Sequence, residues 1–243
     1  VDTYVMPYEH DGYYYNGFQT VLTTATDVSA LKPVFWSANE KSVFATGNEE
    51  GAVAKIQQSG DKSDTTLDFT DDAVEYSVTG DDLKSIKNYW VTFVPRHEGG
   101  AKLFVNGTNG AAVSKDNDGN KIITREIFLT DKFEKYHDIF IANVGDEKLT
   151  GLTAKLSDDA ENVKLDDYWT VGGENNNTLA AFTEVNKDYG KEGELDNVAK
   201  IRLVPDGDGM VSGKLTISAD GQEDVVIKLV GVSGTPTLRT DAI

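Results

Sequence analysis

The sequence predicts an all-β protein made of two antiparallel β-sandwich domains in tandem. Three observations support this: apolar residues alternate with polar ones in many short runs, glycine-containing turns separate the runs, and helical periodicity is almost absent. Alternation with a period of two puts one set of side chains on one face of a strand. Short strands between regular turns are typical of an antiparallel sandwich. A chain of 243 residues has room for two such domains.

Five runs carry the strand pattern, because apolar side chains occupy every second position in each. They are residues 74–79, 89–94, 152–157, 214–218 and 225–229. Two short segments, residues 26–31 and 130–136, have the polar start that favours a single helical turn. We therefore expect strands along most of the chain, with helix confined to isolated turns.

The clearest domain boundary lies between residues 95 and 100. Pro95 follows the run 89–94 directly, and the pair Gly99-Gly100 comes four residues later. Proline cannot donate to a strand ladder and paired glycines favour a turn, so the sheet should stop here. We predict one domain over residues 1–97 and a second over residues 98–243.

The charge balance restricts the partners. The chain has 41 acidic and 23 basic side chains, which gives a formal net charge of −18. Such a surface repels phosphate backbones and anionic lipids, so we expect no nucleic-acid partner. No run approaches the roughly 20 apolar residues that span a bilayer, so we expect no membrane insertion. The chain opens without a signal peptide, which we interpret as an excerpt of a longer exported protein.

The chain contains no cysteine, which excludes disulfides, thiolate nucleophiles and cysteine-ligated zinc. Exported proteins of Gram-positive bacteria are commonly acidic and free of cysteine. We therefore expect an extracellular location on the surface of a Gram-positive bacterium, and no cofactor.

The sequence gives little sign of catalysis. None of the three histidines, His10, His97 and His137, lies beside a nucleophile motif, and no G-x-S-x-G is present. We expect His137, which precedes a strand-like run, to pack in the core or to cap a turn. The prediction is that the chain is not an enzyme and has no catalytic residue.

Two acidic segments resemble calcium loops but are also ordinary turns. The segment that begins at Asp116 lacks the glycine and glutamate of an EF-hand, because Lys121 and Ile127 occupy those positions. Asp206 and Asp208 lie in an Asp-Gly-Asp-Gly sequence that suits either a turn or a bound Ca²⁺. We predict no metal ligands.

Clustered aromatics are the candidate ligand-binding residues. They are Tyr13, Tyr14, Tyr15 and Phe18 near the start, and Tyr168 and Trp169 further on. Consecutive residues of a strand face opposite sides, so at least one of the three adjacent tyrosines should face solvent. An exposed tyrosine suits a sugar ring or a protein partner. The alternatives are an edge strand folded over the rim for the first cluster and a core role for Trp169.

The first half resembles small immunoglobulin-like domains that occur in tandem in surface proteins of Firmicutes. Residues 26–35 resemble their "TDLTSLKPTF" opening, residues 68–79 their "DFTNPVTYTVT" strand, and residues 88–94 their closing "YTVTV" strand. The resemblance covers about 70 residues and implies an immunoglobulin-like fold outside the cell.

The second half resembles immunoglobulin-like modules of the abnormal-spindle and choice-of-anchor type. The pattern begins with Asn143-Val144-Gly145 at the end of a strand and continues with residues 149–152. Its strongest part is residues 201–234, although Val204 stands where the family has phenylalanine before the proline. The resemblance implies fold and compartment and says little about the ligand.

Three functions remain open for a non-catalytic module of this kind. The first is binding to a host protein, such as an antibody variable region gripped in the manner of a superantigen. The second is a passive stalk that contacts neighbouring modules of the same parent chain. The third is carbohydrate binding, with the tyrosine and tryptophan rings as stacking platforms for a glycan.

Overall fold

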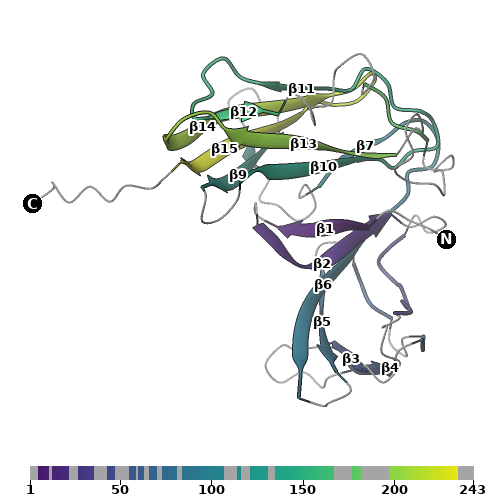
Figure 1. The fold of residues 1–243 in the computed structure, drawn as a ribbon. Coiled ribbons are helices and arrows are strands. Elements are labelled where there is room, and N and C mark those ends of the chain that lie inside the picture. The colour runs from purple at the N-terminus through teal and green to yellow at the C-terminus, as the bar shows by residue number, and fades with distance from the viewer. Residues whose placement is uncertain are drawn as a thin grey trace, which may run out of the picture. The chain divides into compact units, whose positions relative to one another are not determined.

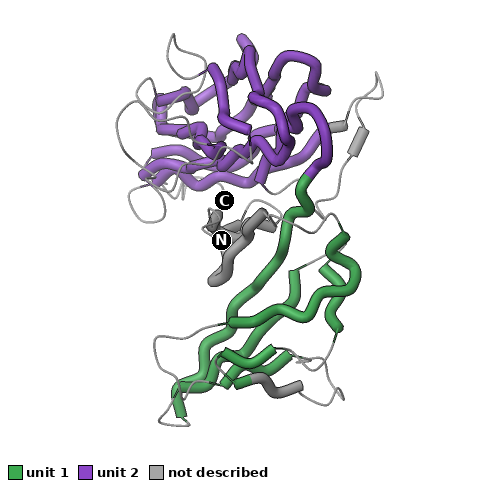
Figure 2. The backbone as a smooth tube through the Cα atoms, turned by 90° about the vertical axis from the view of Figure 1, so that its right-hand side faces the viewer, with its two compact units in different colours: residues 1–10, 14–96 green, residues 11–13, 97–243 purple. Residues whose placement is uncertain are grey.

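A computed structural model describes residues 5–10, 13–21, 27–35, 43–46, 55–58, 60–62, 66–69, 73–80, 84–106, 114–115, 121–130, 135–166, 177–181 and 197–234. These residues form strands, bridges and turns, and no helix lies among them. The predicted all-β fold class is confirmed. The chain divides into two compact units (Figure 2): unit 1 comprises residues 1–10 and 14–96, and unit 2 comprises residues 11–13 and 97–243.

Unit 1 is built on one six-stranded sheet with the order β1-β2-β6-β5-β3-β4 (Figure 1). Its strands are β1 (Val5–His10), β2 (Tyr13–Val21), β3 (Val43–Thr46), β4 (Lys55–Gln58), β5 (Val74–Thr79) and β6 (Ile86–Val94). β5 runs antiparallel to both β3 and β6. β2 runs parallel to β6, from Gly17 beside Trp90 to Val21 beside Val94. The prediction of purely antiparallel pairing is wrong at this strand.

The core of unit 1 follows the predicted alternation. Tyr76 of β5 and Val91 of β6 are each 2% exposed. Phe69 lies outside the sheet and packs edge-on against Phe93, with ring centroids 4.8 Å apart. Phe69 belongs to a segment that lies over one face of the sheet together with the segment around Leu31. The two segments are joined by backbone hydrogen bonds, because Leu31 N donates to Leu67 O and Leu67 N donates to Leu31 O. The sheet and these segments enclose an apolar core of their own.

The helical turn predicted over residues 26–31 is not formed in the part that the structure describes. Asp27 Oδ1 accepts hydrogen bonds from Ser29 N at 2.8 Å and from Ser29 Oγ at 2.6 Å. A short acidic side chain that binds the backbone two residues ahead favours a turn over a helix. The other predicted helical turn falls mostly on residues 131–134, outside the described residues.

Unit 2 is a sandwich of two sheets (Figure 1). The four-stranded sheet has the order β12-β13-β10-β7, and the five-stranded sheet has the order β11-β14-β15-β9-β8. The strands are β7 (Leu103–Val105), β8 (Ser114–Lys115), β9 (Lys121–Leu129), β10 (His137–Asn143), β11 (Thr153–Leu156), β12 (Val163–Leu165), β13 (Val198–Pro205), β14 (Gly209–Ser218) and β15 (Val225–Ser233). β9 and β15 are parallel; the other recorded pairings are antiparallel.

The core of unit 2 lies between the two sheets and is made of alternate residues from both. Ile139 and Ile201 from the four-stranded sheet are fully buried, as are Leu215 and Ile227 from the five-stranded sheet. The runs 152–157, 214–218 and 225–229 were predicted as strands, and β11, β14 and β15 confirm them. Burial of such aliphatic side chains supplies most of the free energy that holds two sheets together.

The buried side-chain amide of Asn143 links three backbone segments at one end of the sandwich. Asn143, at the end of β10, is 0% exposed, and its Oδ1 accepts hydrogen bonds from Lys102 N and Gly145 N, each at 3.1 Å. Its Nδ2 donates to Glu147 O at 2.7 Å and to Ala180 O at 2.8 Å. One side chain thus satisfies backbone groups of three separate segments, which explains the asparagine of the Asn143-Val144-Gly145 motif.

The glycine of the same motif is required by close packing. A Cβ at Gly145 would lie 2.3 Å from Gly100 O and 2.6 Å from Lys102 N. Real Cβ atoms do not approach backbone this closely. The segment 100–102 therefore sits against Gly145 because that residue has no side chain.

Asn143→Ala should lower the free energy of unfolding of unit 2 by about 3 kcal/mol or more, because each buried polar group left unsatisfied costs roughly 1–3 kcal/mol. Urea denaturation measures this difference. Asn177→Ala, which truncates an exposed amide in the same unit, is the matched control and should cost about 0.5 kcal/mol or less. Equal effects of the two substitutions would contradict the role given to Asn143.

Separate cores predict that damage to one unit leaves the other folded. Phe93→Ala should destabilise unit 1 by about 3–5 kcal/mol, and Ile201→Ala should destabilise unit 2 by about 2–5 kcal/mol. Amide hydrogen exchange followed by mass spectrometry reads the two units separately. Faster exchange in both units after either substitution would show that the chain is one cooperative domain.

Candidate functional site

The structure places the first predicted aromatic cluster on one strand. Tyr13, Tyr14, Tyr15 and Phe18 all belong to β2, and Phe18 pairs with Val91 of β6. The exposure of their side chains lies outside what the structure describes. Tyr168 and Trp169 lie outside the described residues as well. The ligand-binding role of all six stays a prediction.

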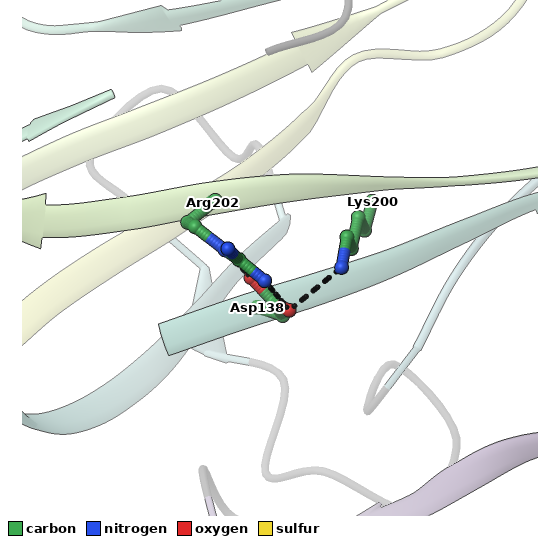
Figure 3. Close-up of polar contacts among 3 residues, drawn as sticks. All are labelled: Asp138, Lys200 and Arg202. Atoms are coloured by element: carbon green, nitrogen blue, oxygen red, sulfur yellow. Dashed lines mark hydrogen bonds and ion pairs between the residues drawn. The ribbon is translucent and has the colours of Figure 1, made fainter. Parts of the chain in front are cut away.

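A charged cluster occupies the outer face of the four-stranded sheet of unit 2 (Figure 3). Ile139 and Ile201 pair across β10 and β13 and point into the core. Because side chains alternate along a strand, Asp138, Lys200 and Arg202 project from the opposite face. Asp138 is the direct cross-strand partner of Arg202. We call these three residues and the neighbouring Tyr136 the outer-face cluster.

Asp138 is bound by two cations. Arg202 Nε donates to Asp138 Oδ1 at 2.6 Å, and Arg202 Nη2 donates to Asp138 Oδ2 at 2.8 Å. Lys200 Nζ lies 3.3 Å from Asp138 Oδ2. A two-bonded arginine–carboxylate pair is the strongest and most direction-specific ion pair that side chains form. The guanidinium plane is therefore fixed relative to the sheet.

Tyr136 stacks on this fixed plane. The Arg202 Cζ atom lies 3.6 Å from the centroid of the Tyr136 ring, within the range of a cation–π contact. Arg202 and Asp138 are largely buried, with side chains 13% and 12% exposed. Tyr136 is 47% exposed. The cluster thus presents to solvent an aromatic ring whose orientation is set by an ion pair beneath it.

The electrostatics of the cluster suit positioning better than proton transfer. Burial raises the pKa of Asp138, but the hydrogen bonds from Arg202 and the charges of Lys200 and Arg202 outweigh it, so the pKa lies below its ordinary value. A carboxyl group with a lowered pKa stays ionised at neutral pH and is a poor general acid or base. Its chemical contribution here is to hold Arg202, and through Arg202 the ring of Tyr136.

Of the two acidic segments singled out in the sequence, the one around Asp206 and Asp208 forms no metal cage among the described residues. Asp206 Oδ1 is 2.9 Å from Lys164 Nζ, and Asp208 lies against Gly234. No group of three or more histidine, aspartate or glutamate side chains gathers in the part of the chain that is described. Residues 116–120 of the other segment fall outside that part.

His137 behaves as predicted. It is 1% exposed at the start of β10, where it packs in the interior of unit 2. His97 contributes through its backbone, because its N donates to Val144 O at 2.9 Å.

Among the described residues, no helix is long and apolar enough to cross a membrane.

The sequence interpretation missed the outer-face cluster. Tyr136 was assigned to a helical turn, and Asp138, Lys200 and Arg202 were not singled out. A signal was present, because Lys200 and Arg202 alternate with Ile201 and Leu203, and Asp138 stands directly before Ile139. Alternation shows that the charges share the outer face of each strand. It does not give the register that pairs Asp138 with Arg202 across 64 residues of sequence.

No family model and no curated protein matches this chain. Solved structures give distant likenesses. One is the S-layer protein SbsC, domains 4 and 5, with 11% identity over 93% of this chain and 88% of that one, at a TM-score of 0.24. Another is the Bacteroides ovatus mixed-linkage glucan utilization locus protein SGBP-B in complex with a heptasaccharide, with 9% identity over 95% and 71%, at a TM-score of 0.22.

A third likeness is an endo-fucoidan hydrolase of glycoside hydrolase family 107, with 12% identity and a TM-score of 0.23. The alignment covers 89% of this chain and 28% of the hydrolase. At these TM-scores none of the three carries an argument about this chain.

Asp138→Asn should lower the free energy of unfolding of unit 2 by about 1.5–3 kcal/mol at pH 7, because hydrogen bonds to a charged group are lost. A carboxyl group with a lowered folded-state pKa contributes stability that is present above its unfolded pKa, about 3.9, and is lost as the pH falls from there through the lower folded-state pKa. The difference between the parent and the variant should therefore shrink below about pH 4.

Urea denaturation at several pH values between 2.5 and 7 measures the effect. Asp158→Asn changes an exposed turn residue and serves as the control for general charge effects. A difference for Asp138→Asn that stays constant over this pH range would contradict the ion-pair explanation.

Proposed function

We propose that this chain is a non-catalytic binding and display module of a bacterial cell-surface protein. The observation that carries the proposal is the outer-face cluster, in which a half-exposed Tyr136 ring is held on a largely buried Arg202–Asp138 pair. A ring fixed in this way loses little conformational freedom when a ligand covers it, which favours binding. The acidic, cysteine-free composition supports a location outside the cell.

A binding role fits the cluster better than a catalytic one. An acid–base catalyst needs a group that gives or takes a proton near neutral pH. The pKa of Asp138 is lowered, and both of its oxygens are engaged by cations. The remaining conspicuous group, His137, is 1% exposed and beyond the reach of a substrate. These features support a site that recognises a partner without transforming it.

The partner class that we propose is a protein, with antibody variable regions as the first to test. Tyrosine and arginine are enriched among the residues that dominate protein–protein binding energy. The cluster places Tyr136 at the surface and Arg202 directly beneath it. The tyrosines of β2 stay a separate predicted site.

A glycan is the second candidate, and the fixed ring favours it. Sugar rings stack on flat aromatic faces, and the orientation of Tyr136 is set before any ligand arrives. Lys200, a member of the cluster, has a side chain that is 26% exposed and can donate to a sugar hydroxyl. A glycan array tests this candidate independently of the protein candidate.

Tyr136→Ala should weaken partner binding about tenfold or more while leaving the fold intact, because the ring is the exposed part of the cluster. The measurement is retention of pooled immunoglobulin on the immobilised chain, in parallel with a glycan array. Met210→Ala is the matched control, because Met210 is 68% exposed in the same unit but lies away from the cluster on β14. Tyr136→Phe should bind like the parent chain.

The outcomes separate the candidates. Retention of immunoglobulin that is lost in Tyr136→Ala and kept in Met210→Ala supports the protein partner. Glycan hits with the same dependence support the sugar. Binding that is equal in all three variants removes the outer-face cluster as the site. If the chain binds neither immunoglobulin nor any glycan of the array, the passive stalk is the better function.

A further inference from the structure

The last strand of unit 2 is hydrogen-bonded along both edges. Eight consecutive residue pairs join β15 to the parallel strand β9, from Val226 beside Ile122 to Ser233 beside Leu129. Gly234 N donates to Leu129 O at 2.9 Å and so extends this ladder. Along its other edge, β15 pairs with β14 over its full length. We call the parallel pairing the β9–β15 clamp.

The chain enters unit 2 at the end where β15 begins. Residues 97–103, the incoming segment, are bonded to the turn between β14 and β15 through Gln222. Gln222 Oε1 accepts from Leu103 N at 3.1 Å, and Gln222 Nε2 donates to Ala101 O at 2.9 Å. The incoming segment is therefore anchored beside the first residues of β15.

The incoming segment is also tied firmly to the end of β10. Val144 N donates to Lys102 O at 2.9 Å, and Lys102 N donates to the buried Asn143 side chain. Three residues before Lys102, Gly99 N donates to Asp146 Oδ2 at 3.0 Å. A pull on the start of unit 2 therefore acts on β10 and on the β14–β15 turn together.

The chain leaves the sandwich at the opposite end, where β15 finishes (Figure 1). Gly234 lies against Asp208, and Asp208 immediately precedes β14. Because β14 and β15 form an antiparallel pair, the start of β14 and the end of β15 are at the same end, far from Gln222. Tension applied between the incoming segment and Gly234 therefore acts along the axis of β15.

We propose that unit 2 is a load-bearing element, in which the β9–β15 clamp resists tension along the chain. Hydrogen bonds between strands run across the strand direction, so an axial pull loads all of them at once. A pull that separates neighbouring strand ends opens the same bonds one at a time and meets less resistance. This function goes beyond display and rests on the hydrogen-bond geometry alone, whatever the partner of the outer-face cluster.

Packing under the clamp opposes sliding in the same direction. Ile127 and Leu129 of β9 and Ile227 and Leu229 of β15 are all 0% exposed and belong to the core of unit 2. A slip of β15 by one residue would turn its buried side chains toward the other face. Hydrogen bonds and apolar burial must therefore be broken together before β15 moves.

A substitution at Gly231 should weaken the β9–β15 clamp. Gly231 has a φ of 145°, and an added Cβ would lie 1.8 Å from Ile127 O in the neighbouring strand. Gly231→Ala should push β9 and β15 apart within their paired stretch. Gly221, in the β14–β15 turn, also has a positive φ, 70°, but an added Cβ there meets nothing within 4 Å. Gly221→Ala is therefore the matched control for backbone strain.

Single-molecule pulling on the full chain tests the proposal. The chain has no cysteine, so paired substitutions to cysteine fix the points at which handles attach. Handles at Glu98→Cys and Ile243→Cys pull along β15, whereas handles at Lys135→Cys and Ile243→Cys pull β15 away from the sandwich at its end. At one loading rate, the first pair should give an unfolding force at least about twofold higher. Equal forces would overturn the proposal.

The two glycine variants test independently whether the β9–β15 clamp resists the pull. Gly231→Ala should lower the unfolding force between Glu98→Cys and Ile243→Cys clearly more than Gly221→Ala does. An unchanged force in Gly231→Ala would overturn the clamp as the resisting element. Should Gly231→Ala fail to fold, the comparison of the two pulling directions with Gly231 in place still decides.

Discussion

The buried amide of Asn143 is the interaction on which the arrangement of unit 2 depends. Both polar atoms of its side chain, Oδ1 and Nδ2, are hydrogen-bonded to backbone of residues 102, 145, 147 and 180, in a site closed to water. A buried polar group is tolerated only when its hydrogen bonds are made, so these segments are held in one geometry. That geometry fixes where the incoming segment meets β10, and hence where tension enters the sandwich.

Both units place an early strand parallel to their last strand. In unit 1 this is β2 beside β6, and in unit 2 it is β9 beside β15. The last strand then pairs antiparallel with the strand before it in each sheet. The shared arrangement leaves the last strand bonded on both edges and inside the sheet, so neither unit ends on a bare edge strand.

The sequence was enough to predict the fold class and the strands with strong alternation. The runs 74–79 and 214–218 needed only the period of two, because one face of each strand is buried. The parallel pairing of β9 with β15 was not predictable, since the alternation of a strand is the same whichever direction its neighbour runs. The Asp138–Arg202 pair required the register of β10 against β13, and these two residues are 64 positions apart in sequence.

The outer-face cluster and the β9–β15 clamp lie on different sheets. The proposed binding of a partner and the proposed resistance to tension therefore use different strands. Tyr136 precedes β10 in the four-stranded sheet, whereas the clamp belongs to the five-stranded sheet. The Arg202–Asp138 pair cross-links β10 to β13, so a ligand that pulls on Tyr136 acts on two strands through Arg202. Because those strands share the core with β9 and β15, a load on the bound ligand passes into the sandwich without first peeling a single strand from its edge.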